Sequence, residues 1–429
     1  MKNIMTGSAV VNMNPPVGLD MTGYIARESG SVGFHDELKI RCVVFDKGIE
    51  RFAMIACDLL ALDSEFFQSV AGLIERKTQI PADKIVIFCV HTHSGPASIH
   101  LQDCGEENKL WMDDLKNRIS DCVLDAVNRL KLSVFSYRNG ICETGVNRVS
   151  GNKGQSDTQV GTLVIHDADT GDIVTVIVNF ACHAVVLDQT NLLYSKDFPH
   201  YLEAGLKENY GEMADIIFAN GCGGDINPIY RGDFVMAEKV GRKLSESITA
   251  IKSDTITNAS FGDGDISMDT IKLTIPLKHN LNEKNLNELK ASFIKGLADE
   301  ILKNGDGPQA KPYRAYINWS DRMLGKIWDN TLPNSVKAEL KFIRIGPLVI
   351  LTIPFEVFHS IGLRLKEHFG KYNTMIIGYA NGDFGYLPSK ELYAAAGYES
   401  GLAYRYYGYP GPVCENAEDL LFNAFANHG

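Results

Sequence analysis

The sequence predicts an α/β protein, a layered α/β sandwich in which helices cover both faces of a mixed sheet. Short apolar runs rich in Val and Ile, typical of buried strands, alternate with stretches of helical period along most of the chain. Polar residues and histidines directly follow several of these runs, at the strand ends where open α/β sheets bind ligands. No repeat, low-complexity segment or linker divides the 429 residues, so we expect a single domain over 1–429.

The composition narrows the class of protein and its partners. With 42 Lys and Arg against 53 Asp and Glu the formal charge is −11, and no basic run stands out, so we expect no nucleic-acid partner. No apolar stretch approaches the roughly 20 residues of a membrane span, so we expect no stable membrane insertion. Nine scattered cysteines without a CxxC pair, and an N-terminus without the apolar core of a signal peptide, predict a reduced, cytoplasmic protein.

In the first half of the chain, strands are predicted where apolar residues run together and helices where they recur every third or fourth position. A glycine-punctuated loop over 18–33 is interpreted as a surface loop rather than as the wall of a site. The expected elements are a strand over 10–16, paired strands over 38–45 and 51–58, a helix over 64–77, a buried strand over 85–89, a helix over 107–130, and strands over 134–138, 145–148, 160–166 and 173–180.

The second half continues the alternation of strands and helices. The expected elements are a buried strand over 216–219, a helix over 233–251, a strand over 269–276, a helix from near 282, a hairpin over 340–345 and 348–353, a helix ending near 368, a strand over 375–379 and a final helix over 417–426. Between two of these strands lies a helical insert over about 280–332. Because helical inserts often only pack on the surface, we interpret it as a decoration rather than a lid.

The first candidate site follows the buried strand over 85–89, in the motif His91-Thr92-His93-Ser94-Gly95-Pro96. If the strand continues through the motif, residues two apart point to the same side, and His91 and His93 both face one cleft. Ser94-Gly95-Pro96 is a cluster of residues that breaks regular structure, so the strand must end there. Taken alone, the two histidines are equally well explained as strand-end residues satisfied by ordinary hydrogen bonds.

Further polar residues follow other predicted strands and extend this candidate site. They are His183, the pair Asp225 and Asn227, Glu356 and, in a later loop, Tyr386. Two imidazoles and a carboxylate are the minimal protein ligand set of a catalytic zinc ion, which keeps one position open for water. Such an ion lowers the pKa of its water and polarises a carbonyl group, the two tasks of metal-assisted hydrolysis. The sequence therefore predicts a metal site at the strand ends.

These residues also carry a resemblance to a known family. The chain resembles the catalytic-domain portion of the neutral/alkaline (non-lysosomal) ceramidase family over nearly its whole length. The motifs that carry the resemblance are His91-Thr92-His93-Ser94-Gly95-Pro96, Asn147-Arg148, Phe180-Ala181-Cys182-His183, Gly224-Asp225-Ile226-Asn227-Pro228, Pro354-Phe355-Glu356 and the pair Tyr386 and Tyr398.

The resemblance implies a Zn²⁺ ion and a role for each matching residue. The implied metal ligands are His91, His183, Glu356 and Tyr386. Tyr386 is preferred to Tyr379 and Tyr393 because the family's substrate-contacting tyrosine lies twelve positions after its ligand tyrosine, as Tyr398 does after Tyr386. In the same way, the resemblance implies that His93 either supports the metal ligands from beside them or acts as an acid–base residue near the reacting carbonyl, and Arg148 matches the family's substrate-binding arginine.

Two departures from the family bear on the substrate. Asn227 stands where ceramidases carry a serine near the scissile amide, and a carboxamide supplies neither a nucleophile nor a hydroxyl proton. We also expect no counterpart of the family's C-terminal immunoglobulin-like domain in this protein. We therefore expect metal-activated water to attack an amide or ester carbonyl of a small soluble substrate, while Asn227 orients the substrate or donates to an oxyanion.

Three alternatives remain open at the level of sequence. The first is a true ceramidase, an N-acylsphingosine amidohydrolase, which shares the same chemistry. The second is a non-catalytic relative that binds metal or ligand, which the replacement of the family serine by Asn227 favours. The third is an iron oxygenase with two histidines and one carboxylate, although such sites usually lie inside a β-barrel. The oligomeric state is not predicted.

Overall fold

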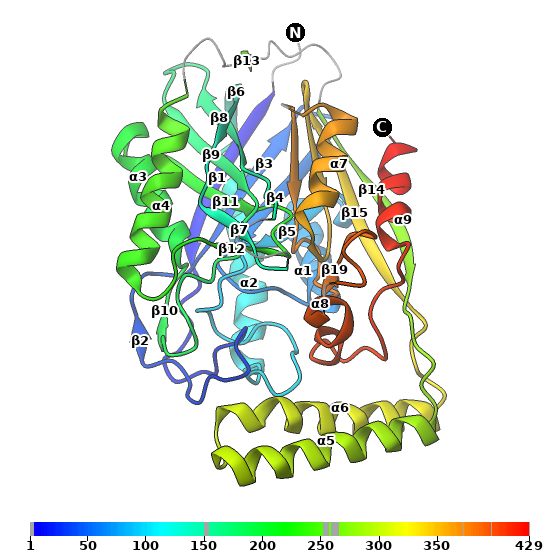
Figure 1. Ribbon diagram of the computed structural model, residues 1–429. Coiled ribbons are helices and arrows are strands. Elements are labelled where there is room, and N and C mark those ends of the chain that lie inside the picture. Colours follow the sequence, from blue (N-terminus) through cyan, green and yellow to red (C-terminus); the bar gives the residue numbers. More distant parts are fainter. Residues whose placement is uncertain are drawn as a thin grey trace.

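Two β-sheets pack face to face, and helices cover the outer face of each (Figure 1). The computed structural model describes residues 4–149, 154–251, 257–258, 266–371, 373–395 and 397–428. The predicted α/β class, with a large mixed sheet and covering helices, is confirmed. The second sheet was not anticipated, because apolar runs show that strands are buried but not which strands pair.

The larger sheet has the strand order β11-β9-β8-β6-β1-β3-β4-β5, with β13 also paired to β6. Its strands are β1 Met5–Asn12, β3 Lys39–Asp46, β4 Arg51–Cys57, β5 Ile85–Cys89, β6 Lys131–Ile141, β8 Gln159–Asp167, β9 Ile173–Phe180, β11 Asp215–Asn220 and β13 Thr257–Asn258. The first strand begins earlier than predicted and ends at Asn12, before Asn14-Pro15-Pro16, since proline has no N–H for a strand ladder.

The two ends of the larger sheet come together, and this meeting positions the site. Its halves are joined where Met5 and Thr6 pair with Leu132 and Lys131, and the sheet bends there. Beyond the bend, the segment after β5 forms a parallel bridge to the segment after β9, between Thr92 and Ala184. Asn220, the last residue of β11, donates its side-chain N–H to the carbonyl of Val90. Three strand ends, those of β5, β9 and β11, are thereby held side by side.

The smaller sheet has the order β14-β15-β16-β18. Its strands are β14 Ile266–Pro276, β15 Ser335–Ile345, β16 Leu348–Thr352 and β18 Thr374–Ile377. One apolar cluster fills the space between the sheets and includes Val43, Phe45, Met54, Phe88, Ile165 and Ile177 from the larger sheet and Met268, Ile343, Ile350 and Met375 from the smaller. Burying both faces of each sheet explains why the strands read as continuous apolar runs rather than as an alternation.

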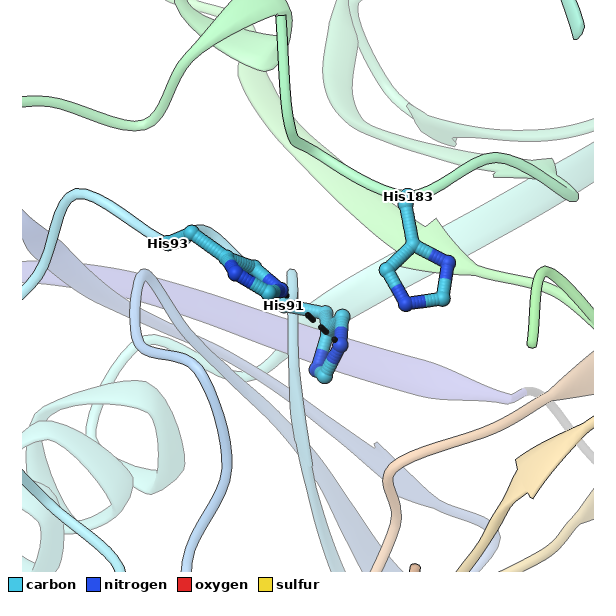
Figure 2. A group of neighbouring side chains, drawn as sticks. All are labelled: His91, His93 and His183. Carbon is cyan, nitrogen blue, oxygen red and sulfur yellow. Dashed lines mark hydrogen bonds between the residues drawn. The ribbon is translucent and has the colours of Figure 1, made fainter. Parts of the chain in front are cut away.

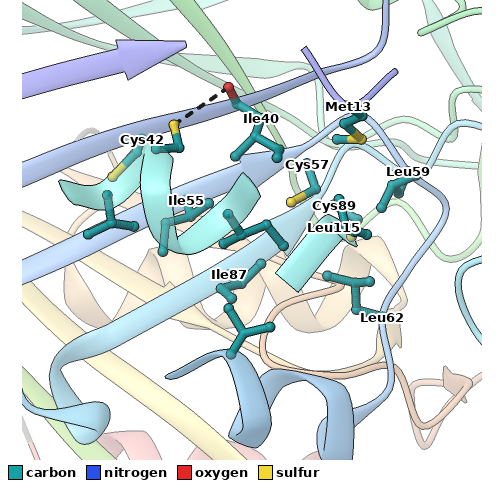
Figure 3. Packing of buried hydrophobic residues seen from close by; sticks show 14 of the residues in the cluster. Met13, Ile40, Cys42, Ile55, Cys57, Leu59, Leu62, Ile87, Cys89 and Leu115 are labelled. Atoms are coloured by element: carbon teal, nitrogen blue, oxygen red, sulfur yellow. Dashed lines mark hydrogen bonds between the residues drawn. The ribbon is translucent and has the colours of Figure 1, made fainter. Parts of the chain in front are cut away.

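Helices complete the outer layers. Those on the larger sheet are α1 Ser64–Thr78, α2 Lys109–Val127, α3 Phe198–Tyr210 and α4 Phe234–Thr249, and those on the smaller sheet are α7 His359–Phe369 and α9 Ala417–Ala426. Cys42, Cys57 and Cys89 pack as small apolar residues against α1 and α2 (Figure 3), and burial raises the pKa of each thiol. Helix α3 was not predicted, because Pro199 at its start resembles a helix breaker although the first turn accommodates proline.

Shorter elements surround the strand ends. Three pairs of short strands lie there, β2 Gly33–Phe34 with β10 Leu193–Tyr194, β7 Gly145–Asn147 with β12 Ile226–Pro228, and β17 Glu356–Val357 with β19 Tyr386–Leu387. Helix α8 Gly397–Gly401 follows in the same region. The insert forms two helices, α5 Glu283–Asn304 and α6 Lys311–Trp328, which run side by side below these loops in Figure 1. Among the described residues, no helix has both the length and the apolar character that crossing a membrane requires.

Candidate metal centre

His91 reaches the site through an unusual backbone conformation. The strand β5 ends at Cys89, and His91 has φ 65°, in the left-handed region that a non-glycine residue adopts at a cost of roughly 1–2 kcal/mol. The sequence predicted that strand alternation would turn His91 and His93 toward one cleft. Strand alternation does not do this, because the strand ends before both residues. The turn brings their rings together instead, and their ring centroids lie 5.0 Å apart. Buried polar contacts fix this turn, including the donation of Thr92 Oγ1 to the carbonyl of Ser195 at 2.7 Å.

His183 and Glu356 approach the same point from two other elements. His183 follows β9, and its backbone N–H donates to the carbonyl of Ile226. Glu356 lies in β17, where it pairs in parallel with Tyr386 of β19. Gly224 makes this close approach possible, since a Cβ on it would lie 2.4 Å from the carbonyl oxygen of Glu356. The glycine-rich loop after β11 thus serves packing at the site.

The three imidazoles share one pattern of hydrogen bonds. Each donates its Nδ1–H to a backbone carbonyl, His91 to Leu60 at 3.0 Å, His93 to Gly23 at 3.0 Å and His183 to Gly223 at 2.5 Å. A carbonyl oxygen only accepts, so each Nδ1 carries a proton, and in a neutral ring the Nε2 then presents a lone pair. Figure 2 shows the three rings turned toward one another. The Nε2 atoms of His91 and His93 lie 3.4 Å apart.

Glu356 adds a carboxylate to this group of lone pairs. Its Oε2 lies 2.9 Å from Nε2 of His183 and 3.3 Å from Nε2 of His91. Three of the four side chains are buried, with His91 1%, His183 0% and Glu356 2% exposed, and His93 is half-buried. Burial raises the pKa of Glu356, but His91 and His183 act more strongly in the opposite direction, so that pKa lies well below its ordinary value. The carboxylate is therefore charged.

This arrangement fits a bound cation. Burial, and then the nearby His91 and His183, hold the pKa of His93 well below its ordinary value, and burial lowers the pKa of His183 to about 4. With the rings in the neutral form, the imidazoles and the carboxylate face one another with acceptor atoms alone, which is unfavourable without a positive charge between them. Tetrahedral zinc with ligands at about 2.0–2.1 Å separates neighbouring ligand atoms by about 3.3 Å. The separations of 3.3 and 3.4 Å agree with this value, and the 2.9 Å between His183 and Glu356 is shorter, at hydrogen-bond distance.

The structure places the three implied ligands His91, His183 and Glu356 together, and it also brings His93 into the group. The ligand atoms of His91, His93 and His183 all lie within 4.8 Å of one another. His93 was expected beside the metal ligands rather than among them. Its proximity to His91 makes it both a possible ligand and a possible base.

The tyrosines are arranged differently from one another. The hydroxyl of Tyr386 accepts a hydrogen bond from Nη2 of Arg148 at 3.0 Å. Tyr379 stacks on His91 with ring centroids 4.0 Å apart, and Tyr393 donates its hydroxyl to the carbonyl of Val413. Tyr407 donates to Oε1 of Glu356 at 2.5 Å. Sequence reasoning did not find this contact, because no local pattern connects Tyr407 with Glu356, which lies 51 positions earlier.

Arg148 is held in place by several acceptors. Its Nε donates to Glu399 at 3.0 Å, its Nη1 to Oδ1 of Asn227 at 3.2 Å, and its Nη2 to the carbonyl of Gly224 at 2.7 Å as well as to Tyr386. Burial lowers the pKa of Arg148, but Tyr386 and Glu399 outweigh it, so the guanidinium stays charged. The arginine thereby fixes the position of Asn227, whose Oδ1 is occupied and whose amide N–H groups remain to donate.

Asp225 does not join the metal centre. Its carboxylate accepts from the backbone N–H of His359 at 2.8 Å and lies 2.6 Å from Nδ1 of the same residue. Asn147 donates to it at 2.8 Å. The oxygens of Asp225 are used instead to tie β7 and the start of α7 to the loop after β11.

The loop over 18–33 contacts the centre directly, contrary to its interpretation as a plain surface loop. Gly23 supplies the carbonyl that accepts from His93, and with φ 101° it leaves room for that ring, since a Cβ there would lie 2.5 Å from Nδ1 of His93. Nη2 of Arg27 donates to the backbone carbonyl of His93 at 2.9 Å. The ring of Tyr24 lies 4.9 Å from the ring of His93. This loop therefore sets the position of His93.

Two adjoining cavities open onto the centre. The first, called here the apolar compartment, has a volume of about 240 Å³ and is lined by His91, His93, Glu356, Ile25, Leu60, Leu101, Cys104, Tyr406 and Tyr407. The second, the polar compartment, has a volume of about 520 Å³ and is lined by Arg148, Asn227, Arg231 and Glu399. Tyr24, His93, Tyr386 and Tyr398 line both compartments and so mark their junction.

Comparison with known proteins identifies the fold. Neither protein-family models nor curated proteins match the sequence. The solved structure of neutral ceramidase from Pseudomonas aeruginosa matches with a TM-score of 0.72 and 16% identity, over 100% of this chain and 75% of that one. A ceramidase structure described as complexed with C2 matches with a TM-score of 0.73 and 16% identity, over 99% of this chain and 74% of that one. The chain therefore has a neutral ceramidase-like fold.

Proposed function

We propose that this protein is a zinc-dependent hydrolase that cleaves an amide bond, or an ester bond, in a small substrate. The observation that carries this proposal is the convergence of three imidazole Nε2 lone pairs and the Glu356 carboxylate at the wall of a cavity. Nitrogen and oxygen donors in this number are typical of zinc sites. The neutral ceramidase-like fold supports the same class of chemistry by analogy.

His91, His183 and Glu356 would hold the ion, and it would supply polarisation of the substrate carbonyl and activation of a water molecule. His93 is the imidazole that lines both compartments, and its Nε2 lies 3.4 Å from Nε2 of His91, beside the place where a scissile bond would lie. Because Gly23 holds its Nδ1–H, His93 can take a proton from water at Nε2 and return it to the leaving amine. We assign it this acid–base role.

The residues around Arg148 bind and orient substrate in this proposal. Asn227 offers amide N–H groups for an oxyanion, since its Oδ1 is held by Arg148. Tyr386 and Tyr398 lie at the junction of the compartments, 5.9 Å apart between ring centroids, and contact the substrate there. The fourth ligand implied by the family resemblance is Tyr386, and Tyr407 is its rival because it hydrogen-bonds to Glu356.

The test combines elemental analysis with an activity screen. We expect about one zinc per chain after loading, and hydrolysis of N-acyl compounds of polar amines that disappears on chelation and returns with zinc. Protein that binds zinc but turns over no amide or ester is a binding relative, and the hydrolase proposal fails. Iron bound in preference to zinc, with oxygen consumption, would instead identify the oxygenase alternative.

Hydrolysis of ceramide itself is the second candidate, favoured by a match of the fold over the whole chain. It requires room for a long acyl chain as well as for a long-chain base. A direct comparison of ceramide with N-acyl compounds of short chain length separates the two candidates.

A further inference from the structure

We infer that the apolar compartment receives the acyl part of the substrate and restricts it to a short chain or a single ring, while the polar compartment receives a polar amine part. This inference rests on the proposed hydrolase function and names its substrate class. It follows from the residues that line the two compartments, from the size of the first and from the contacts that hold its wall in place.

The two compartments differ in chemistry. Apart from the metal centre, the apolar compartment is walled by Ile25, Leu60, Leu101, Cys104 and tyrosine rings, which favour a hydrocarbon group. The polar compartment presents Arg231, Asn227 and Glu399, beside Val149, Val185 and Ala395, and the three polar side chains favour groups that form hydrogen bonds. His93 lies at the junction. A scissile carbonyl at the junction thus directs the apolar and polar parts of the substrate to opposite sides.

The size of the apolar compartment limits the acyl group. An engineered protein cavity of about 150 Å³ holds one benzene molecule, with six carbon atoms. By proportion, the 240 Å³ of the apolar compartment holds a group of about ten non-hydrogen atoms. An acyl chain of sixteen carbons exceeds this volume, whereas chains of up to about eight carbons, or a phenylacetyl group, fit.

Hydrogen bonds connect the segments of the compartment wall to one another and to the helical insert. The segment that carries Leu101 and Cys104 is joined to the segment that carries Tyr406 by the backbone bond from Gln102 N–H to the carbonyl of Tyr406 at 2.7 Å. Helix α6 contacts the segment that carries Tyr406, since the hydroxyl oxygens of Tyr316 and Tyr406 lie 3.4 Å apart.

Further hydrogen bonds from α6 hold the same two segments. Arg322 donates to the side chain of Gln102 at 2.6 Å, and Asn318 donates to Asp103 at 2.9 Å. The indole N–H of Trp319 donates to the carbonyl of Tyr409 at 2.8 Å. The insert therefore acts as a brace behind the part of the wall formed by Leu101, Cys104 and Tyr406.

The experiment measures chain-length dependence in two ways. N-acyl derivatives of ethanolamine from acetyl to palmitoyl are assayed for kcat/KM with zinc-loaded protein, and straight-chain carboxylates of the same lengths are titrated by calorimetry. We expect both quantities to rise by up to about fourfold per added methylene, to peak at or before about ten carbons, and to fall at least tenfold by sixteen carbons.

Variants of the wall sharpen the test. Tyr406→Ala removes a ring from the wall and should move the maximum to longer chains, and Leu101→Ala does the same by a smaller step and serves if the first variant fails to fold. Leu302→Ala is the matched control, because this α5 side chain is 86% exposed and should leave the profile unchanged.

Each outcome decides between the proposals. A chain-length limit in carboxylate binding without turnover of any substrate supports this inference and overturns the proposed hydrolase function. Turnover or binding that is strongest with palmitoyl chains overturns this inference and supports ceramide as substrate. Absence of both binding and turnover, or a profile that Tyr406→Ala and Leu101→Ala leave unchanged, also overturns it.

Discussion

Two clusters of histidines in this protein look alike by distance and differ in hydrogen bonding. His91, His93 and His183 form one, and His35, Asp36 and His200 form the other, and in each the possible ligand atoms lie within 4.8 Å of one another. In the second cluster, Nδ1 of His35 lies 3.1 Å from Asp36 and its Nε2 lies 3.3 Å from the hydroxyl of Tyr201.

Both oxygens of the Asp36 carboxylate in the second cluster also accept hydrogen bonds. Asp36 accepts from the hydroxyl of Ser195 at 2.5 Å and from the backbone N–H of Lys196 at 3.0 Å. Every side-chain polar atom of His35 and Asp36 thus has a hydrogen-bond partner, and Nδ1 of His200 lies 3.8 Å from Asp36, so these two residues need no ion to be satisfied. In the first cluster each imidazole donates its Nδ1–H to a backbone carbonyl, and the Nε2 atoms are turned toward one another. Proximity of possible ligand atoms alone does not indicate a metal site. Acceptor atoms that face one another without a donor between them do indicate one.

The largest effect should come from removing a ligand of the first cluster. His91→Ala is expected to abolish zinc binding and to reduce hydrolysis to the background rate, because a buried site with one ligand fewer loses both affinity and geometry. His200→Ala is the matched control and should keep the full zinc content. Elemental analysis of both variants measures the difference, and equal loss of zinc from the two would remove the distinction between the clusters.

The next effect separates metal ligand from acid–base residue within the first cluster. His93→Gln should keep about one zinc per chain and lower kcat by about 10²–10⁴-fold, the usual contribution of a general acid–base group. The measurement is zinc content together with kcat and its pH profile, which should lose one limb. Loss of zinc would show instead that His93 is a ligand, as its distance of 3.4 Å from His91 also allows.

The sequence predicted much of the centre and little of its surroundings. Strand ends place His91, His183 and Glu356, and such ends are readable because apolar runs stop at them. The contacts of Tyr407 with Glu356 and of Gly23 with His93 join segments 51 and 70 positions apart, which no local periodicity encodes. The second sheet was missed for the same reason, since β14 pairs with β15 across the whole insert.

A smaller effect should distinguish the two tyrosines near the ligands. Tyr407→Phe removes the hydrogen bond to Glu356 and should weaken zinc binding by about 10–100-fold, the usual effect of losing a group that orients a metal ligand. Tyr386→Phe should leave affinity closer to that of the wild type and raise KM, if its main contact is with Arg148. Competition with a zinc chelator measures both variants, and the reverse order would favour Tyr386 as the ligand implied by the family resemblance.

The smallest effect concerns the second cluster, where we expect stability to change and metal content to stay the same. His35→Phe keeps the stacking on Phe234, whose ring centroid lies 3.7 Å from that of His35, and removes the hydrogen bond to Asp36. Because Asp36 is 7% exposed and retains its bonds to Ser195 and Lys196, the loss should be about 0.5–1.5 kcal/mol of unfolding free energy. Chemical denaturation measures it, with and without zinc.

The zinc dependence of that measurement completes the comparison. If the hydrogen bonds of the second cluster exclude an ion, zinc should stabilise His35→Phe and the wild type equally, through the first cluster alone. In the His91→Ala background, zinc should then give no stabilisation, whether position 35 is His or Phe. A zinc-dependent rise in stability that survives His91→Ala and disappears with His35→Phe would show that the second cluster binds metal, and that satisfied hydrogen bonds do not prevent it.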